Sequence, residues 1–252
     1  MKVKITLDSA SWEADLSKGV DVSIPIQGGG RGVRCWWVDY PSVKPFQQGD
    51  FIGSVKAGAP VNFNDIAFNP HAHGTHTECM GHITAEEESI LSHPPPPWML
   101  AQLVSVTPEV KQEDRIVTRS GLRQVLAETL PEAVILRTLP NPESKQNKEY
   151  SGSNPPYLEA DAASWLCQKG VLHLLLDLPS VDREEDGGLL AAHKAFWDIP
   201  KAPRPGATIT ELIYVPDEVP DGMYLLNLQM AAFENDASPS RPILFPLKPK
   251  ME

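Results

Sequence analysis

Residues 157–178 read YLEADAASWLCQKGVLHLLLDL and join a helical pattern to a strand pattern. The first part, from Tyr157 to Lys169, has apolar side chains at helical spacing. Its apolar face is made of Leu158, Ala162, Trp165 and Leu166. Gly170 stands where a helix C-terminal cap belongs, and the run from Val171 to Leu178 is typical of a strand buried on both faces. A helix that leads into a buried strand indicates an α/β fold.

Similar apolar patterns recur along the rest of the chain. Alternation or short apolar runs predict further strands at Val3–Leu7, Val20–Ile26, Leu103–Val106, Ala133–Thr138, Met223–Leu228 and Ile243–Leu247. Helical spacing predicts helices from Ser120 to Leu130 and from Leu189 to Trp197. Because strands and helices interleave and no segment looks like a linker, we expect one α/β domain with a mixed sheet over residues 1–252.

The chain has 252 residues and a formal net charge of -11, with 33 acidic against 22 basic side chains. This charge repels phosphate backbones and anionic lipid surfaces, so we expect neither nucleic acid nor a membrane as a partner. The first residues meet charge too early for a secretory signal, and no apolar span has the length of a membrane helix. Three cysteines without a CxxC pair fit a reducing compartment, and we expect a cytoplasmic protein.

Histidines are concentrated in one short segment. Residues 70–82 read PHAHGTHTECMGH and hold four of the seven histidines of the chain, with a glutamate among them. Imidazole and carboxylate groups are the ligands that zinc, manganese and iron take in proteins. A single histidine is more often a surface or core residue, but this density predicts a metal or catalytic site.

The spacing within this segment divides its histidines into two sets. In an extended chain alternate side chains share a face, so His76, Glu78 and His82 would point the same way. His71 and His73 have the opposite parity, and one of them joins that face only if the backbone bulges or turns at the intervening glycine. The candidate site is therefore made of His76, Glu78 and His82, joined by His71 or His73.

Other chemistry has less support in the sequence. The chain lacks the GxSxG turn of serine hydrolases, and the glycine-rich run 28–32 lacks the ends of a phosphate-binding loop. Trp36, Trp37 and Trp98 are candidates for lining a pocket that takes an aromatic or apolar substrate, or else they belong to the core or an interface.

The histidine segment resembles a known signature. Residues 73–78, HGTHTE, and His82 are similar to the HxGTHxDxPxH motif of the cyclase family of metal-dependent hydrolases, which includes bacterial kynurenine formamidase and isatin hydrolase. Further similarities follow in the family's order, at Asp15–Ser17, Val22–Ile26, Leu178–Asp182, His193 and Glu211.

The resemblance implies a swivelling β/α/β-type domain, often a homodimer or higher homo-oligomer, that binds one or two divalent metal ions, zinc or manganese. It implies hydrolysis of the C–N bond of an amide, formamide or lactam in a small-molecule substrate. His76 and Glu78 take the positions of metal ligands. His82 takes the position of a second-metal ligand or proton shuttle, and His193 and Glu211 complete the catalytic groups.

Three positions depart from the motif of the family. Its first histidine falls on Ala72, so His71 or His73 must substitute, and a one-residue bulge favours His71. Its aspartate is Glu78 in this chain, and its proline is Met80. Two alternatives stay open: a binding protein that kept the fold without catalysis, and a family enzyme that acts on another bond by dehydration or ring closure.

Overall fold

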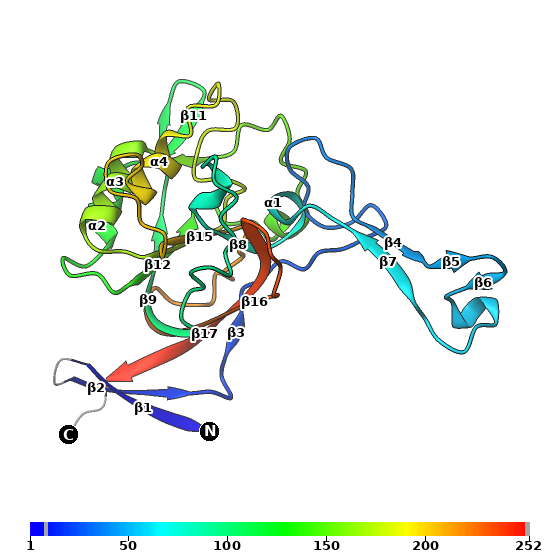
Figure 1. The fold of residues 1–252 in the computed structure, drawn as a ribbon. Helices are drawn as coiled ribbons and strands as arrows, with labels where there is room; N and C mark the ends of the chain where they lie inside the picture. The colour runs from blue at the N-terminus through cyan, green and yellow to red at the C-terminus, as the bar shows by residue number, and fades with distance from the viewer. Residues whose placement is uncertain (8–9, 250–252) are drawn as a thin grey trace.

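Seven strands close into a barrel at the centre of the computed structural model, which describes residues 1–7 and 10–249 (Figure 1). In order around the barrel they are β8 (His76–Glu78), β15 (Thr208–Glu211), β14 (His173–Leu176), β12 (Ala133–Thr138), β9 (Trp98–Val106), β16 (Gly222–Met230) and β17 (Ala237–Pro249). The four neighbours β9, β12, β14 and β15 are parallel, and the other pairings are antiparallel.

The sheet is mixed, as the interleaved pattern predicts, but the sequence did not predict that it closes on itself. Closure depends on β8, which has only three residues and no apolar alternation. This strand pairs with β15 on one side and with β17 on the other, where Glu78 lies opposite Ala237. The swivelling arrangement that the family resemblance implies stays a prediction.

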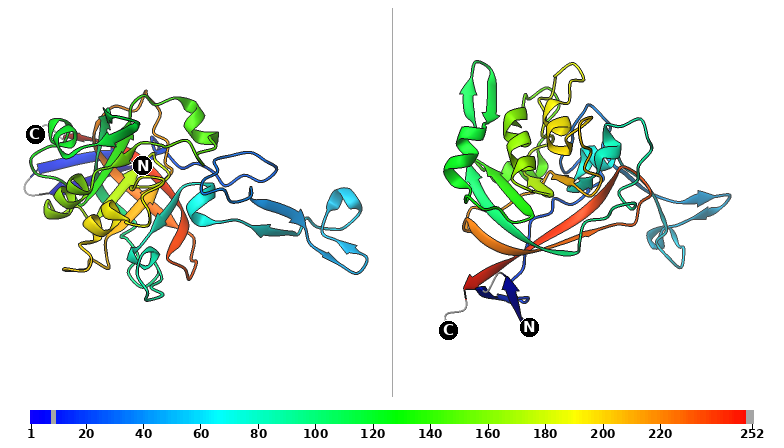
Figure 2. Two further views of the ribbon diagram at one scale, coloured as in Figure 1. Left: turned by 90° about the horizontal axis from the view of Figure 1, so that it is seen from above. Right: turned by 60° about the vertical axis from the view of Figure 1, so that its left-hand side comes forward.

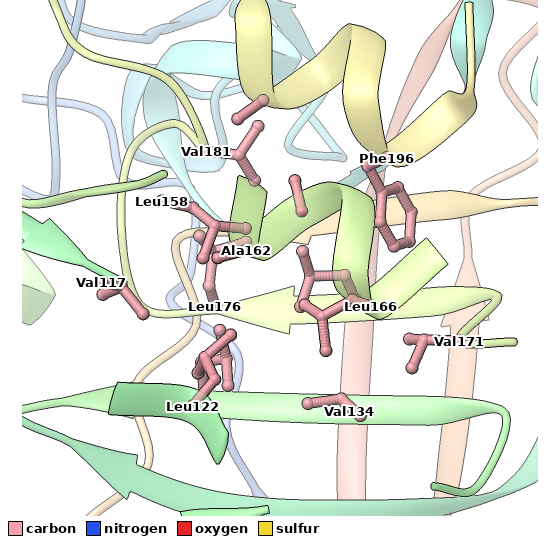
Figure 3. Close-up of a cluster of buried hydrophobic side chains, with 14 of the residues drawn as sticks. Val117, Leu122, Val134, Leu158, Ala162, Leu166, Val171, Leu176, Val181 and Phe196 are labelled. Carbon is pink, nitrogen blue, oxygen red and sulfur yellow. The ribbon is translucent and has the colours of Figure 1, made fainter. Parts of the chain in front are cut away.

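Apolar side chains pack on both sides of the barrel wall. Leu103, Ile135 and Leu226 belong to the cluster on the inner face. Residues of opposite parity pack outward against three helices, α2 (Arg119–Val125), α3 (Ala160–Gln168) and α4 (Ala191–Trp197). Figure 3 shows this outer cluster, in which Leu166 and Phe196 of the helices meet side chains of the strands. The barrel is therefore covered by helices on one side.

The elements differ from their predicted ranges mainly at their ends. The helix predicted from Tyr157 begins at Ala160, because Tyr157–Leu158 form the short strand β13, which pairs with β11 (Asp114–Val117). The helix predicted to reach Leu130 is α2, which ends at Val125. By contrast, β12 has the predicted bounds.

Smaller elements lie around the barrel. They are β1 (Lys2–Leu7), β2 (Ala10–Asp15), β3 (Val20–Asp21), α1 (Pro70–His73), the 3-10 turns η2 (Met80–His82) and η3 (Glu143–Asn147), and β10 (Glu109–Lys111). The hairpin of β1 and β2 extends the sheet from the end of β17. Of the strand predicted over 20–26, only the two residues of β3 are a strand, paired with β17.

A long β arm projects away from the barrel (Figures 1 and 2). Its stem is the antiparallel pair β4 (Ser42–Pro45) and β7 (Asn64–Ala67). Its tip holds β5 (Gln47–Gln48), β6 (Phe51–Ile52) and the 3-10 turn η1 (Val55–Ala57). Within the described ranges, none of the helices has the length and apolar content needed to cross a bilayer.

Candidate metal site

β8 and β15 bring three predicted site residues to the outer face of the barrel. In this antiparallel pair His76 lies opposite Glu211, and Glu78 lies opposite Ile209. Ile209 packs in the cluster beneath the helices, so residues of the same parity on the two strands face the helices as well. α4 lies on that side and contributes the buried His193. The strand thus places His76 and Glu78 on one face, as their spacing predicts.

α1 turns the chain just before β8 and separates His71 from His73. Asn69 caps this short helix by accepting a hydrogen bond from the His71 amide at 2.9 Å. His71 points toward the strand, and its Nδ1 lies 3.1 Å from Oε2 of Glu78. The structure therefore brings His71, rather than His73, to the place that the motif leaves empty at Ala72.

His73 lies outside the site, which corrects its place among the candidate ligands. Its Nδ1 accepts a hydrogen bond from the Asn69 amide, and its Nε2 donates to the carbonyl oxygen of Asp39, both at 2.9 Å. Both ring nitrogens are thus occupied by the backbone. Burial lowers the pKa of His73, which favours the neutral ring that these two bonds require.

Gly74 connects α1 to β8 in an extended conformation, with φ 168°. A Cβ at this position would lie 2.8 Å from the carbonyl oxygen of Ile24 and 2.9 Å from Cγ1 of Ile26. The glycine is therefore needed for close packing of two backbones. The bulge or turn that the sequence predicts at this residue is replaced by the helical turn before it.

Glu78 is the centre of the site and is fully buried. Its Oε1 accepts a hydrogen bond from Nε2 of His193 at 3.1 Å. Its Oε2 lies 3.1 Å from Nδ1 of His71 and 3.9 Å from Nε2 of His82. His82 reaches it through the turn η2, four residues later, and does not continue the strand. Three imidazoles from three different elements therefore surround one carboxylate.

His76 presents an unused nitrogen to the same site. Its Nδ1 donates to the carbonyl oxygen of Gly74 at 3.0 Å, so its Nε2 carries the lone pair. This Nε2 lies 3.5 Å from Oε2 of Glu211, whose Oε1 accepts a hydrogen bond from the Val181 amide. β15 thus adds Glu211 to the site, as the resemblance implies.

Two buried atoms of this site lack hydrogen-bond partners: Nε2 of His76 and Oε2 of Glu78. The Oε2 atom is close to Nδ1 of His71, but the two are not aligned for a hydrogen bond. An unpartnered buried polar atom costs about 1–3 kcal/mol. A divalent cation held by His71, His76 and Glu78 would satisfy both atoms, and their ligand atoms lie within 4.8 Å of one another. The residues therefore fit a metal ion.

A second set of ligand atoms shares the same carboxylate. Glu78, His82 and His193 also offer three ligand atoms within 4.8 Å of one another. Each set on its own could hold a divalent ion, so the number of ions, one or two, stays a prediction. Nitrogen and oxygen ligands of this kind suit both zinc and manganese.

Charges within the site shift the protonation of its groups. Burial opposes the charged form of His193, but hydrogen bonds to Asp182 and Glu78 outweigh it and raise the pKa of His193 to about 10. In the same way, burial is outweighed by Asp236 and Glu78, which raise the pKa of His71 to about 10. The positive imidazoles in turn hold the pKa of Glu78 well below its usual value despite its burial. Bound metal would replace these protons.

Two carboxylates lie behind the histidines, on the side away from Glu78. Oδ2 of Asp182 accepts a hydrogen bond from Nδ1 of His193 at 2.6 Å. Asp236 contacts two rings, with Oδ2 2.8 Å from Nε2 of His71 and 3.3 Å from Nδ1 of His82. Sequence reasoning missed Asp236, which lies 165 residues after His71. The signal that places it is the closure of the barrel, which puts Ala237 opposite Glu78.

A cavity of about 340 Å³ opens onto the site. His71, His82, His193 and Glu211 lie in its wall, together with the apolar side chains of Trp36 and Leu190. The other two candidate tryptophans lie elsewhere. Trp37 is 62% exposed, and Trp98 packs its ring against Phe245 on the opposite part of the sheet.

The sequence and the barrel are similar to those of known proteins. The family model described as a putative cyclase matches residues 15–183. A kynurenine formamidase from Bacillus cereus is 28% identical over 239 residues, which cover 92% of this chain and 99% of that protein. The solved structure of a potential metal-dependent hydrolase with cyclase activity superposes with a TM-score of 0.64 at 18% identity, covering 90% of this chain and 97% of its own.

An isatin hydrolase bound to the product analogue thioisatinate has the same fold. It superposes with a TM-score of 0.57 at 15% identity, covering 92% of this chain and 93% of its own. The family model spans more than half of the chain and includes the whole histidine segment. The resemblance of that segment is thereby confirmed, and the chain belongs to the putative cyclase family.

Proposed function

We propose that this chain is a metal-dependent hydrolase that cleaves an amide C–N bond of a small molecule, such as a formamide or a cyclic amide. The observation that carries the proposal is a pair of buried atoms without hydrogen-bond partners, Nε2 of His76 and Oε2 of Glu78. Both residues belong to one group of candidate metal ligands. The similarity to a kynurenine formamidase and to an isatin hydrolase supports the choice of bond.

When bound, a divalent metal polarises a substrate carbonyl and lowers the pKa of a water molecule toward about 7. The side chains of the site hold and move the protons around it. His193 is fixed between Asp182 and Glu78, so its ring is oriented for proton exchange. His82 is the most exposed of the four site histidines, which suits it to pass a proton to the departing nitrogen.

The cavity supports a small and partly flat substrate. Its volume of about 340 Å³ lies in the range of small-molecule sites, and its polar groups converge on the wall that carries the histidines. Trp36 supplies an aromatic surface beside them, and its indole nitrogen donates to the His71 carbonyl oxygen. An aromatic or other ring attached to the amide would stack on this side chain.

Metal analysis and an amide hydrolysis assay test the proposal together. Purified protein should retain or bind zinc or manganese and hydrolyse members of a panel of N-formyl aromatic amines and cyclic amides. A chelator should abolish the activity, and added metal should restore it. His93→Ala is a control for the loss of a histidine outside the site, because His93 is exposed and bonds to Glu88. This variant should keep both metal binding and activity.

Failure to bind a divalent metal at micromolar concentration would contradict the proposed function. Metal binding without hydrolysis of any amide would favour the alternative of a binding protein that kept the fold. Dehydration or ring closure of a substrate by the metal-loaded protein would favour the alternative of a family enzyme acting on another bond.

We also propose that two copies of the chain associate through the β4–β7 arm. The arm exposes a row of large apolar side chains: Val43, Phe51, Ile52, Val55, Val61, Phe63 and Ile66. A two-stranded hairpin is marginally stable alone, and exposed apolar patches of this kind mark protein interfaces. Ile66→Asp should convert a dimer to a monomer in sedimentation, whereas a monomeric wild-type protein would contradict the proposal.

The three cysteines are free thiols in the structure. This supports the cytoplasmic location that we propose.

A further inference from the structure

Asp236 lies between two imidazoles of the site and is shared by them. The rings of His71 and His82 are stacked, with centroids 4.2 Å apart and planes 27° apart. Both direct one nitrogen to the same oxygen, Oδ2 of Asp236, at 2.8 Å from His71 and 3.3 Å from His82. Their other nitrogens face Oε2 of Glu78, at 3.1 Å and 3.9 Å. Each ring is thus held between an outer carboxylate and the central one.

The closure of the barrel fixes the position of Asp236. Its carbonyl oxygen accepts a hydrogen bond from the Cys79 amide at 3.0 Å. The next residue, Ala237, is paired with Glu78 in the β8–β17 ladder. Two backbone connections therefore hold Asp236 against the histidine segment. Its side chain is 25% exposed, so the carboxylate lies at the edge of the site and not at its buried centre.

The two nitrogens of His71 have different partners, and this difference decides the tautomer. Nε2 and Oδ2 of Asp236 form an aligned hydrogen bond, in which the N–H group donates to the carboxylate. Nδ1 is close to Oε2 of Glu78 but is not aligned with it for a hydrogen bond. The proton therefore belongs on Nε2 in the neutral ring, which leaves the Nδ1 lone pair directed at the metal site.

We infer that Asp236 is the positioning residue of the metal site: it fixes the tautomer and ring orientation of His71, so that Nδ1 is the ligand atom. The inference rests on the proposed function, because it assumes that a metal binds beside Glu78. It also explains how His71 can replace the histidine that the family motif has at the position of Ala72. His71 lies one residue earlier in the chain, so its ring needs an additional contact, with Asp236, to face β8 and Glu78. Carboxylates that hold a ligating histidine in this way contribute about 10–100-fold to metal affinity.

Asp236→Asn tests the inference, because the amide keeps the shape of the side chain and loses its charge. Zinc affinity is measured by competition with a chromogenic chelator, together with zinc stoichiometry and the melting temperature of the metal-free protein. We expect affinity to fall about 10–100-fold with unchanged stoichiometry. Asp236→Glu restores a carboxylate and should recover part of the affinity. Glu234→Gln is the matched control, because it removes one exposed charge two residues away.

A spectroscopic measurement separates positioning from general stability. In the zinc-loaded wild type, ring ¹⁵N shifts should show His71 bound through Nδ1 with a slowly exchanging proton on Nε2. Asp236→Asn should speed the exchange of that proton or change the coordinating nitrogen, at an unchanged melting temperature of the metal-free protein.

The outcomes distinguish this inference from the proposed function. A wild-type chain that binds neither zinc nor manganese overturns both. A wild type that binds zinc while Asp236→Asn binds it equally well overturns the inference alone. Loss of one of two bound zinc ions in Asp236→Asn also overturns it, because Asp236 would then be a ligand. Zinc binding that depends on Asp236 in a protein without amidase activity supports the inference and contradicts the proposed function.

Discussion

α1 and β8 lie on either side of Gly74, and they present their side chains to the site by different rules. In β8, residues two apart share a face, and His76 and Glu78 both point at the candidate metal site. In α1, residues two apart are rotated by about 200° around the helix axis, so His71 and His73 point to opposite sides. Two of the three side chains of β8 therefore point into the site, but only one of the two histidines of α1 does so.

The difference shows why one histidine-rich segment performs two tasks. His71 turns inward and meets Glu78, whereas His73 turns to the backbone and bridges Asn69 to Asp39. This second histidine stabilises the loop that carries the first. The same residue type is therefore a candidate ligand at one position and a structural residue two positions later.

The largest effect should come from the strand. His76→Ala removes a ligand atom at the buried centre of the site, and we expect loss of metal binding and of amide hydrolysis. Thr77→Val is the control from the opposite face of β8, where the Thr77 hydroxyl bonds to the hydroxyl of Thr210. It leaves the buried Thr210 hydroxyl without this partner, so it should cost about 1–3 kcal/mol in the free energy of unfolding without affecting the metal. Metal content after dialysis compares the two variants.

This prediction depends on the parity of β8. If Thr77→Val lost as much metal as His76→Ala, the assignment of one face of the strand to the site would be wrong.

The two histidines of α1 should give the next largest contrast. His71→Ala removes a ligand, so metal affinity should fall by more than the roughly 10–100-fold expected for an outer partner. His73→Ala should leave metal affinity within about threefold, since the ring of His73 bonds to backbone groups of Asn69 and Asp39 and not to a candidate ligand. The substitution removes the hydrogen-bond partner of the Asn69 amide and of the Asp39 carbonyl oxygen. Its free energy of unfolding should fall by about 1–3 kcal/mol. Metal titration and denaturant unfolding separate the two effects.

Equal loss of metal in both variants would contradict the comparison. So would an unaffected metal affinity in His71→Ala together with a loss in His73→Ala, because the sequence alone left both histidines as candidates.

The sequence predicts the parts of the site that depend on local spacing. Alternation places His76 and Glu78 together, and the motif of the family places His193 and Glu211 with them. The parts of the site that the sequence does not predict depend on contacts between residues far apart in the chain. The closure of β8 on β17 brings in Asp236, and nothing near residue 236 marks it as a site residue.

The same limit applies to the fold and to α1. The long apolar strands and their order follow from periodicity, and β12 has its predicted bounds. α1 has only four residues, too few to show a helical period in the sequence. The hydrogen bond from the His71 amide to the side chain of the N-cap residue Asn69 sets the direction in which the helix starts. An extended reading of residues 70–73 therefore predicts a bulge where the chain forms a helical turn.

Gly74→Ala changes the junction between the two regions and should have a smaller effect. The backbone at Gly74 is extended, so alanine can adopt it, but its Cβ would lie 2.8 Å from the Ile24 carbonyl oxygen. Backbone must shift to relieve this contact, and we expect a loss of about 1–3 kcal/mol in the free energy of unfolding. Metal affinity should also fall, because α1 and β8 are displaced relative to one another. Unchanged stability would show that the packing against Ile24 is looser than the structure indicates.

The smallest effect concerns the protonation of the two α1 histidines in the metal-free protein. Asp236 and Glu78 raise the pKa of His71 to about 10, whereas burial lowers the pKa of His73. A raised pKa means that protonated His71 stabilises the fold fully below its unfolded value of about 6.5, and that this contribution is lost as the pH rises through about 10. The lowered pKa of His73 has the opposite sign, so its contribution is lost as the pH falls below about 6.5.

Ring ¹⁵N shifts recorded between pH 5 and pH 10 on chelator-stripped protein would measure both groups. At pH 8 we expect His71 to be protonated and His73 to be neutral with its proton on Nε2, as its bond to the Asp39 carbonyl requires. Added zinc should then release a proton from His71 and leave the His73 signals unchanged, because a ligand must deprotonate and a structural histidine need not. Proton release from His73 instead would reverse the assignment of the two rings.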